Sequence, residues 1–206
     1  MCAKDGPWRI VGRCYNLIMV IGVDEVGRGC WAGPLVAAAV GFLGRVPEGL
    51  SDSKKLSAKR RMQLAQVIQN ATEYIGIGWV WPKEINKLGL TKSVQVAMQR
   101  AYNALPGLPG ECQIIVDGNI NYLSHISRSK AEVRADGSVS EVSAASIVAK
   151  VARDAYMQQI ALKYQGYGFE AHVGYGTRQH VKALQRYGVL PIHRVHYKPI
   201  RALLAT

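Results

Sequence analysis

Two neighbouring carboxylates, Asp24 and Glu25, stand where a buried strand is expected to end. They follow the apolar run 17–23, and adjacent like charges are costly because each raises the pKa of the other. A chain with 26 Lys and Arg against 14 Asp and Glu, a formal net charge of +12, has no general need for such a pair. Neighbouring strand residues face opposite sides of a sheet, so both acids can serve one site only if the strand ends or bends there, which Gly27 and Gly29 permit. We therefore expect a metal-binding or catalytic role, and the alternative is an exposed turn.

A third acid repeats this arrangement. Asp117 follows the apolar run 114–116 and precedes a glycine. Sites in open α/β sheets lie beyond the carboxyl ends of strands, so Asp117 can meet the first pair in space. Asp136, in a glycine-containing loop, is by itself typical of a turn. Carboxylates without His or Cys at ligand spacing favour a hard cation such as Mg²⁺ or Mn²⁺. In a basic protein this chemistry suits phosphodiester cleavage, with two ions roughly 3.5–4 Å apart.

A glycine-rich segment follows the first acids. Its pattern, G-x-G-x-x-x-G from Gly27 to Gly33, is one residue longer than a dinucleotide-binding fingerprint, and Pro34 does not continue a helix. Exposed backbone groups beside these glycines can instead approach a sugar-phosphate and contact the ribose 2′-hydroxyl, which distinguishes RNA from DNA.

Two further segments can contact nucleic acid. Ser53 and Lys54 precede an expected helix N-terminus, where they can hold a phosphate or simply belong to a capped surface helix. Tyr175 lies in a turn between two glycines, where its ring can stack on a sugar or base, or anchor the packing of the turn.

The basic residues gather in two stretches. Five cations and no acid occur in 53–72, and six cations and no acid occur in 171–206. Such faces attract polyanions, of which nucleic acid is the commonest, although a generic solvated surface is the alternative. No apolar run reaches the roughly 20 residues of a membrane-spanning helix, and no signal-peptide core is present ahead of residue 17. Four scattered cysteines without C-x-x-C spacing indicate reduced, mostly buried thiols of a cytoplasmic protein.

The expected elements form an α/β layer fold with a mixed sheet. The run 34–43 follows the first strand too closely for a crossover helix and predicts its hairpin partner. Further strands are expected over 72–81 and 113–116, and helices over 58–70, from Pro82, from Thr91, over 141–163 and over 178–187. Ser57 and Thr91 are the expected helix caps, and the last helix is expected to start after Thr177. The expected buried side chains include Met62, Leu64, Ala65 and Ile68 in the first helix, and Trp79 and Trp81 beside it.

Five segments in this order resemble ribonuclease HII, the type 2 ribonuclease H of bacteria and archaea. They are 22–29 with 32–34, 52–56, 116–119, 143–154, and 174–177 followed by His180. The resemblance implies an α/β, ribonuclease H-like fold with a mixed central β-sheet flanked by helices and a helical C-terminal part. It implies one catalytic domain over 1–206, with a short N-terminal extension over 1–16 and a basic helical region over about 171–206.

The implied activity is endonucleolytic. The enzyme would hydrolyse the RNA strand of RNA–DNA hybrids and nick 5′ of single ribonucleotides embedded in duplex DNA, leaving 5′-phosphate and 3′-hydroxyl ends. Its role would be ribonucleotide excision and RNA primer removal, performed by a cytoplasmic monomer.

The resemblance also assigns residues. Asp24, Glu25, Asp117 and Asp136 would be the catalytic carboxylates that bind one or two Mg²⁺ or Mn²⁺ ions. Gly27, Arg28 and Gly29 would recognise the ribonucleotide at the RNA–DNA junction, and Tyr175 would pack against the deoxyribose that follows. The expected phosphate contacts are Ser53, Lys54, Ser146 and Lys150.

Some positions depart from the family pattern. Cys30 and Trp31 stand where smaller residues are common, and His196 and Tyr197 stand where Ser-Phe is usual. Arg134, Ala135 and Ser140 differ from the pattern around the fourth acid. Two alternatives stay open: a ribonuclease HIII-like activity on RNA tracts, and a hybrid-binding module without catalysis.

Overall fold

The computed structural model describes residues 18–50 and 56–205. Within these ranges, strands form a mixed sheet in the order β3-β2-β1-β4-β5. The strands are β1 (Met19–Val26), β2 (Leu35–Gly41), β3 (Ile75–Val80), β4 (Cys112–Asp117) and β5 (Ser129–Glu132). β2 is antiparallel to both β1 and β3, whereas β4 is parallel to β1 and to β5. The expected hairpin and mixed sheet are confirmed.

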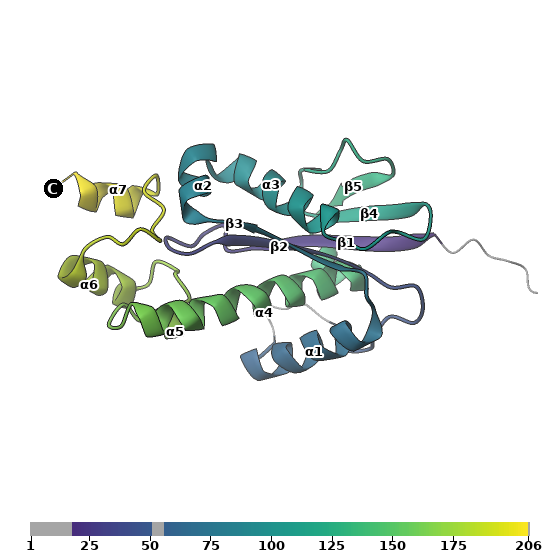
Figure 1. Ribbon diagram of the computed structural model, residues 1–206, viewed down its shortest axis with the longest axis horizontal. Coiled ribbons are helices and arrows are strands. Elements are labelled where there is room, and N and C mark those ends of the chain that lie inside the picture. The colour runs from purple at the N-terminus through teal and green to yellow at the C-terminus, as the bar shows by residue number, and fades with distance from the viewer. Residues whose placement is uncertain (1–17, 51–55, 206) are drawn as a thin grey trace, which may run out of the picture.

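Helices cover both faces of the sheet (Figure 1). They are α1 (Ala58–Ala71), α2 (Pro82–Leu88), α3 (Leu90–Asn103), α4 (Ser140–Lys163), α5 (Phe169–His172), α6 (Arg178–Tyr187) and α7 (Lys198–Leu204), with the 3-10 turn η2 (Ala135–Gly137) before α4. α2 and α3 lie on one face, α1 and α4 lie on the other, and α5 to α7 extend beyond one end of the sheet. The helical C-terminal part is therefore confirmed. Among the described residues, every helix is too short or too polar to cross a membrane.

Helix α4 lies directly on β1 because the touching surfaces are small. A Cβ atom added to Gly22 would stand 2.1 Å from the backbone carbon of Glu141. The buried side of α4 carries Ser143, Ala144 and Ala145, which allow this close approach. The helix is thereby fixed across the middle of the sheet, and the residues that it carries toward the end of β1 are fixed with it.

The sheet separates two apolar cores. One core joins α3 to β1, β2 and β4, and it contains Val94, Ala97 and Met98. The other joins α1 and α4 to the opposite face, and it contains Leu64 and Ile68. A third cluster, built around Phe169, holds the C-terminal helices together.

Several expectations about these elements were wrong. Met62 of α1 is 60% exposed and Trp81 is 42% exposed, so neither belongs to the core. Trp79 is partly buried and stacks on Trp81 with ring centroids 5.5 Å apart. Helix α3 begins at Leu90, preceded by Gly89 as its cap, so Thr91 does not cap it. Ser57 and Thr177 do cap α1 and α6, since each side chain accepts a backbone N–H.

Candidate active site

An open cavity of about 270 Å³ lies beyond the ends of β1 and β4. It gathers three of the four expected carboxylates together with most of the expected substrate contacts. Its lining residues are Asp24, Glu25, Val26, Gly27, Arg28, Gly29, Asp117, Ser146, Lys150 and Tyr175. Ser53 and Lys54 lie outside the described residues, as do Cys2 and Cys14.

Asp24 and Glu25 lie inside β1, which corrects the expectation that the strand ends before them. β1 continues to Val26, where it still pairs with Val36 of β2. Its pairing with β4, however, stops at Val23. The two acids therefore belong to a strand that projects past its parallel neighbour, and both reach the cavity at that unpaired edge.

Burial makes the charge on these two acids costly. Asp24 is only 6% exposed, and burial, followed by the neighbouring Glu25 charge, raises its pKa from 3.8 to about 8. A hydrogen bond with Ser146 acts in the opposite direction. Burial also raises the pKa of Glu25, opposed by Arg28, whose Nη1 lies 3.2 Å from the Glu25 carboxylate. A nearby cation would favour the ionised form of both acids.

Asp117 connects the end of β4 to the turn that carries Asp136. Its Oδ1 accepts a hydrogen bond from the backbone N–H of Ala135 at 2.8 Å. Asp136 is the next residue, it is buried, and its carbonyl accepts a hydrogen bond from the Ser143 hydroxyl of α4. Asp136 does not line the cavity, and its connection to the site is through its neighbour Ala135, which contacts Asp117.

The chemistry of these donors fits a hard divalent cation. Carboxylate oxygens are the ligands that Mg²⁺ and Mn²⁺ prefer, and a bound cation offsets the repulsion among buried acids. Among residues 18–50 and 56–205, no three His, Cys, Asp or Glu side chains are already gathered as a metal-binding cluster. The carboxylates that line the cavity, and so are the candidate ligands, belong to Asp24, Glu25 and Asp117.

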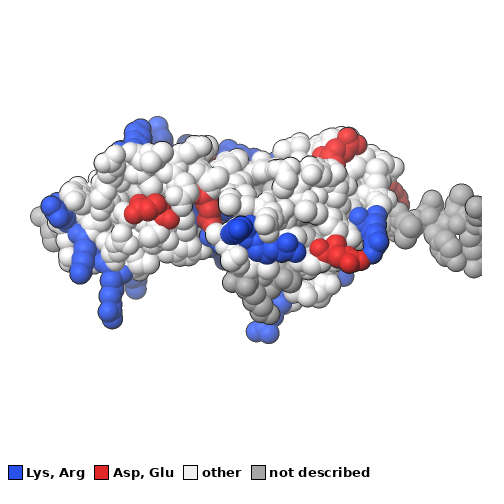
Figure 2. Space-filling view, turned by 90° about the horizontal axis from the view of Figure 1, so that it is seen from below, with Lys and Arg blue, Asp and Glu red and all other residues white. Residues whose placement is uncertain are grey.

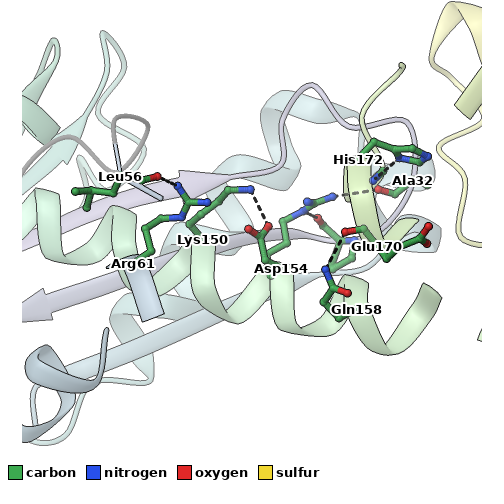
Figure 3. Close-up of polar contacts among 11 residues, drawn as sticks. Ala32, Leu56, Arg61, Lys150, Asp154, Gln158, Glu170 and His172 are labelled. Atoms are coloured by element: carbon green, nitrogen blue, oxygen red, sulfur yellow. Dashed lines mark hydrogen bonds and ion pairs between the residues drawn. The ribbon is translucent and has the colours of Figure 1, made fainter. Parts of the chain in front are cut away.

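Cationic and aromatic groups form the opposite wall of the cavity. Lys150 of α4 pairs with Asp154 at 2.7 Å, and its ammonium lies 6.0 Å from the centre of the Tyr175 ring. Figure 3 shows this pair on α4, with Arg61 reaching from α1 to the carbonyl of Leu56. Tyr175 is 39% exposed, so its ring is available to a bound molecule.

A chain of histidines supports the Tyr175 turn. His180 Nδ1 faces the carbonyl of Tyr175 at 2.9 Å and must donate to it, because the carbonyl is only an acceptor. The His180 Nε2 then accepts from His193 Nε2 at 3.0 Å, and His193 Nδ1 accepts from the Leu190 N–H at 2.8 Å. Burial lowers the pKa of the His180 and His193 rings to about 4, so both imidazoles are neutral at pH 7.

Sequence reasoning missed the residues that hold the glycine-rich loop. Trp31, in this loop, packs over the Tyr175 turn, since a Cβ at Gly176 would stand 2.1 Å from its ring. Arg153 and Arg194 are completely buried behind the loop. In the sequence, Arg194 is one of six cations in a stretch without acids, and no local pattern marks it as buried.

This chain is similar to proteins of known class in sequence and in structure. The family model for ribonuclease HII matches residues 21–200. A ribonuclease HII from Neisseria meningitidis serogroup A is 43% identical over 194 residues, which cover 91% of this chain and 96% of that protein. One from Cereibacter sphaeroides is 44% identical over 186 residues, covering 90% of this chain and 86% of that protein.

The comparison with solved structures agrees with the comparison of sequences. Ribonuclease H2 from Pyrococcus horikoshii OT3 superposes with a TM-score of 0.74 at 28% identity, over 90% of this chain and 97% of that one. A Bst ribonuclease HIII in complex with Mn²⁺ superposes with a TM-score of 0.69, covering 100% of this chain and 75% of that one. Its 20% identity supports the shared fold alone.

Proposed function

We propose that this chain nicks duplex DNA 5′ of single embedded ribonucleotides. The premise is that the chain belongs to the ribonuclease HII family, and is a type 2 ribonuclease H acting on RNA–DNA. The same activity would hydrolyse the RNA strand of longer hybrids and leave 5′-phosphate and 3′-hydroxyl ends. The observation that carries the proposal is one cavity lined both by buried carboxylates and by the Gly27–Arg28–Gly29 loop.

The four acids have different positions, and we assign them different roles. Asp24, Glu25 and Asp117 would hold one or two Mg²⁺ or Mn²⁺ ions, which supply Lewis acidity and positive charge for phosphodiester hydrolysis. Asp136 would join them from η2, which is tied to Asp117 through the Ala135 N–H. Ser146 orients Asp24 through their hydrogen bond.

Substrate recognition is assigned to the loop and to the wall that faces it. The backbone groups of Gly27 and Gly29 are close enough to the cavity to contact a ribose 2′-hydroxyl, and Arg28 adds a positive charge. Tyr175 would pack against the next deoxyribose, where an added 2′-hydroxyl would be crowded. Lys150 would hold a phosphate beside it, in exchange for part of its interaction with Asp154.

The wider role follows from this specificity. We assign the protein to ribonucleotide excision and RNA primer removal in the cytoplasm, working as a monomer with one catalytic domain. Ser53 and Lys54 remain proposed phosphate contacts, together with the exposed cations of the C-terminal region.

The decisive experiment uses a DNA duplex with one ribonucleotide in one strand. We expect wild type to cut on its 5′ side with Mg²⁺ or Mn²⁺, and we expect EDTA or Asp117→Asn to abolish cutting. Glu111→Gln is the matched control, because it neutralises an exposed acid at the opposite end of β4 and should cut normally.

Other outcomes separate the alternatives. Cleavage of RNA tracts without cleavage at a single ribonucleotide would indicate a ribonuclease HIII-like specificity. Binding of the duplex without cleavage in either metal would indicate a hybrid-binding module and would overturn the catalytic proposal.

A further inference from the structure

The loop between β1 and β2, residues 27–34, is held from behind by a buried arginine. Arg194 is 0% exposed, and its Nη1 donates to the carbonyls of Gly27 at 2.7 Å and Arg28 at 3.1 Å. Its Nε and Nη2 both donate to the carbonyl of Gly33, at 3.1 and 3.0 Å. One planar guanidinium therefore fixes both ends of the loop, which a flexible ammonium could not do.

A second buried arginine reinforces this arrangement from α4. Arg153 is 0% exposed and donates to the carbonyls of Ala32 at 3.2 Å and Pro34 at 2.9 Å. Its Nη1 is buried without a hydrogen-bond partner. Within the described part of the chain, neither arginine forms an ion pair with an acid. Buried charge of this kind is costly, so the loop carbonyls supply its main compensation.

The Tyr197 hydroxyl completes the contact with Arg28. It donates to the Arg28 carbonyl and accepts from Arg194 Nη1 at 3.2 Å. The Tyr197 ring also lies beneath the guanidinium, 5.6 Å from its central carbon. Tyr197 is one of the positions where this chain departs from the usual Ser-Phe pattern, and a phenylalanine would retain the ring without the hydroxyl.

A separate set of contacts holds Tyr197 in place. The Asn86 side chain of α2 donates to the carbonyl of His193 at 3.3 Å and accepts from the Val195 N–H at 2.9 Å. The His196 ring is 2.6 Å from the Asn86 carbonyl. The segment that carries Arg194 and Tyr197 is therefore anchored to α2, independently of the loop that it contacts.

We propose that Tyr197 and Arg194 are positioning residues for ribonucleotide recognition. They turn the carbonyls of Gly27 and Arg28 into the protein interior, and so fix the face of the loop that lines the cavity. This inference rests on the proposed function, because it assigns the loop the task of recognising the ribonucleotide. The Tyr197 hydroxyl is the group that connects Arg194 to the Arg28 carbonyl.

The test is Tyr197→Phe, measured with two ligands. The first is a duplex with one ribonucleotide, for which kcat and KM are determined with Mg²⁺. The second is the same duplex made entirely of DNA, for which Ki as a competitor is determined. We expect kcat/KM to fall by about threefold to tenfold, the usual effect of one net hydrogen bond, while Ki stays unchanged.

Two further variants serve as references for the size of the loss in Tyr197→Phe. Arg194→Lys keeps the charge without the planar fork, so it should lose more than Tyr197→Phe does. Tyr102→Phe removes a hydroxyl from α3, which packs on the opposite face of the sheet from α4, and should behave as wild type. If Arg194→Lys fails to fold, Tyr197→Phe still decides the question.

The outcomes are distinguishable. A wild-type kcat/KM in Tyr197→Phe, or an equal loss in kcat/KM and in affinity for the DNA duplex, would overturn the positioning role. A wild-type enzyme that does not cut the ribonucleotide duplex would instead refute the proposed function itself.

Discussion

Individual acids in the cavity are costly to ionise in the folded protein. Asp24 is nearly inaccessible to water and adjoins Glu25, and the nearby cation, Arg28, is itself half exposed. Sites built for function commonly reduce stability in this way. The site's acids therefore should weaken the metal-free fold while making metal binding favourable.

The first prediction concerns Asp24→Asn in metal-free protein. The pKa of Asp24 is raised from 3.8 to about 8 in the folded state, so its contribution to stability is present at low pH and is lost as the pH rises through about 8. Asparagine resembles the protonated acid and avoids this loss. We expect unfolding in EDTA at pH 8.5 to become less favourable by about 1–2 kcal/mol, with a smaller change at pH 5, where the loss has only begun.

Thermal melts at the two pH values test this prediction, with Glu111→Gln as the control. The same substitution should abolish cleavage. An unchanged or lower melting temperature at pH 8.5 would show that the buried Asp24 charge is not destabilising.

At the level of single side chains, the sequence predicts less than the structure shows. Met62 matches a helical apolar pattern but lies at the margin of the buried stripe of α1, and 60% of it is exposed. Trp81 follows the last residue of β3, where the sheet no longer covers it. In the sequence, nothing near Arg194 distinguishes it from the other cations of its stretch. It is buried because it contacts the loop 27–34, which is distant in the sequence.

Among the elements, α6 and the segment after it depend on neutral histidines. His180 and His193 face each other through their Nε2 atoms, 3.0 Å apart, and His172 stacks on His180 with centroids 4.6 Å apart. Burial lowers the pKa of both facing rings to about 4, and for His180 the two neighbouring histidines act in the same direction. A proton added to His180 would place its Nε2–H against the Nε2–H of His193. A proton added to His193 would place its Nδ1–H against the backbone N–H of Leu190.

The second prediction follows from these lowered pKa values. The unfolded chain binds protons at these histidines near pH 6.5, whereas the folded chain does so only near pH 4. Stability from the pair is therefore present above pH 6.5 and is lost as the pH falls toward 4. We expect the urea midpoint to fall between pH 7 and pH 4.5.

The control isolates the pair from other titrating groups. His193→Gln should lower the midpoint at pH 7 and reduce its dependence on pH over this range, whereas His125→Gln, in an exposed loop, should leave the dependence as in wild type. An identical pH dependence in wild type and His193→Gln would contradict the prediction.

Elements with long apolar patterns were predictable, and short polar ones were not. The sequence predicts the first strand, its hairpin partner and the cap Ser57, and the structure confirms them. β5 consists of Ser-Lys-Ala-Glu, which has no apolar alternation, and it exists because β4 offers it an edge. Asp24 and Glu25 lie inside β1 because β2 extends the strand beyond its apolar run.

At the scale of the whole molecule, cations outnumber acids, with 26 Lys and Arg against 14 Asp and Glu. Figure 2 shows Lys and Arg side chains projecting from both ends of the α1 and α4 face, and acidic side chains in small separate groups. On α6, Arg178, Lys182 and Arg186 line a cavity of about 350 Å³. Arg194 is buried, so it cannot share in the phosphate binding expected of the C-terminal cations.

The third prediction concerns the salt dependence of binding. If the three cations of α6 neutralise phosphates, their replacement by Gln should make the plot of log affinity against log salt less steep by about 1 for each phosphate that is no longer neutralised. Fluorescence anisotropy with a labelled duplex in EDTA provides the measurement. The matched control replaces Lys83, Lys87 and Lys92, which are exposed on α2 and α3. Equal slopes for the two triple variants would exclude α6 from the phosphate-binding surface.

The meeting of three acids at one site was predictable, because the strand topology alone brings them together. Asp24, Glu25 and Asp117 come from parallel neighbours, whose carboxyl ends meet at one edge of the sheet. Asp136 is absent from the cavity lining, and its position depends on how η2 packs against α4, for which the sequence has no local signal.

The contact between Arg194 and the β1–β2 loop also sets an order in time. A ribosome makes chains N-terminal first, at about 5–20 residues per second, and Arg194 is added 167 residues after Gly27. For roughly 10 to 30 seconds the growing chain would have its first two acids without the arginine that organises the neighbouring loop. A nascent chain interrupted before Arg194 would contain all four acids and Arg153, but it would lack the guanidinium that binds both ends of the loop. The hydrogen bonds of Arg194 to the loop can therefore form only late in synthesis.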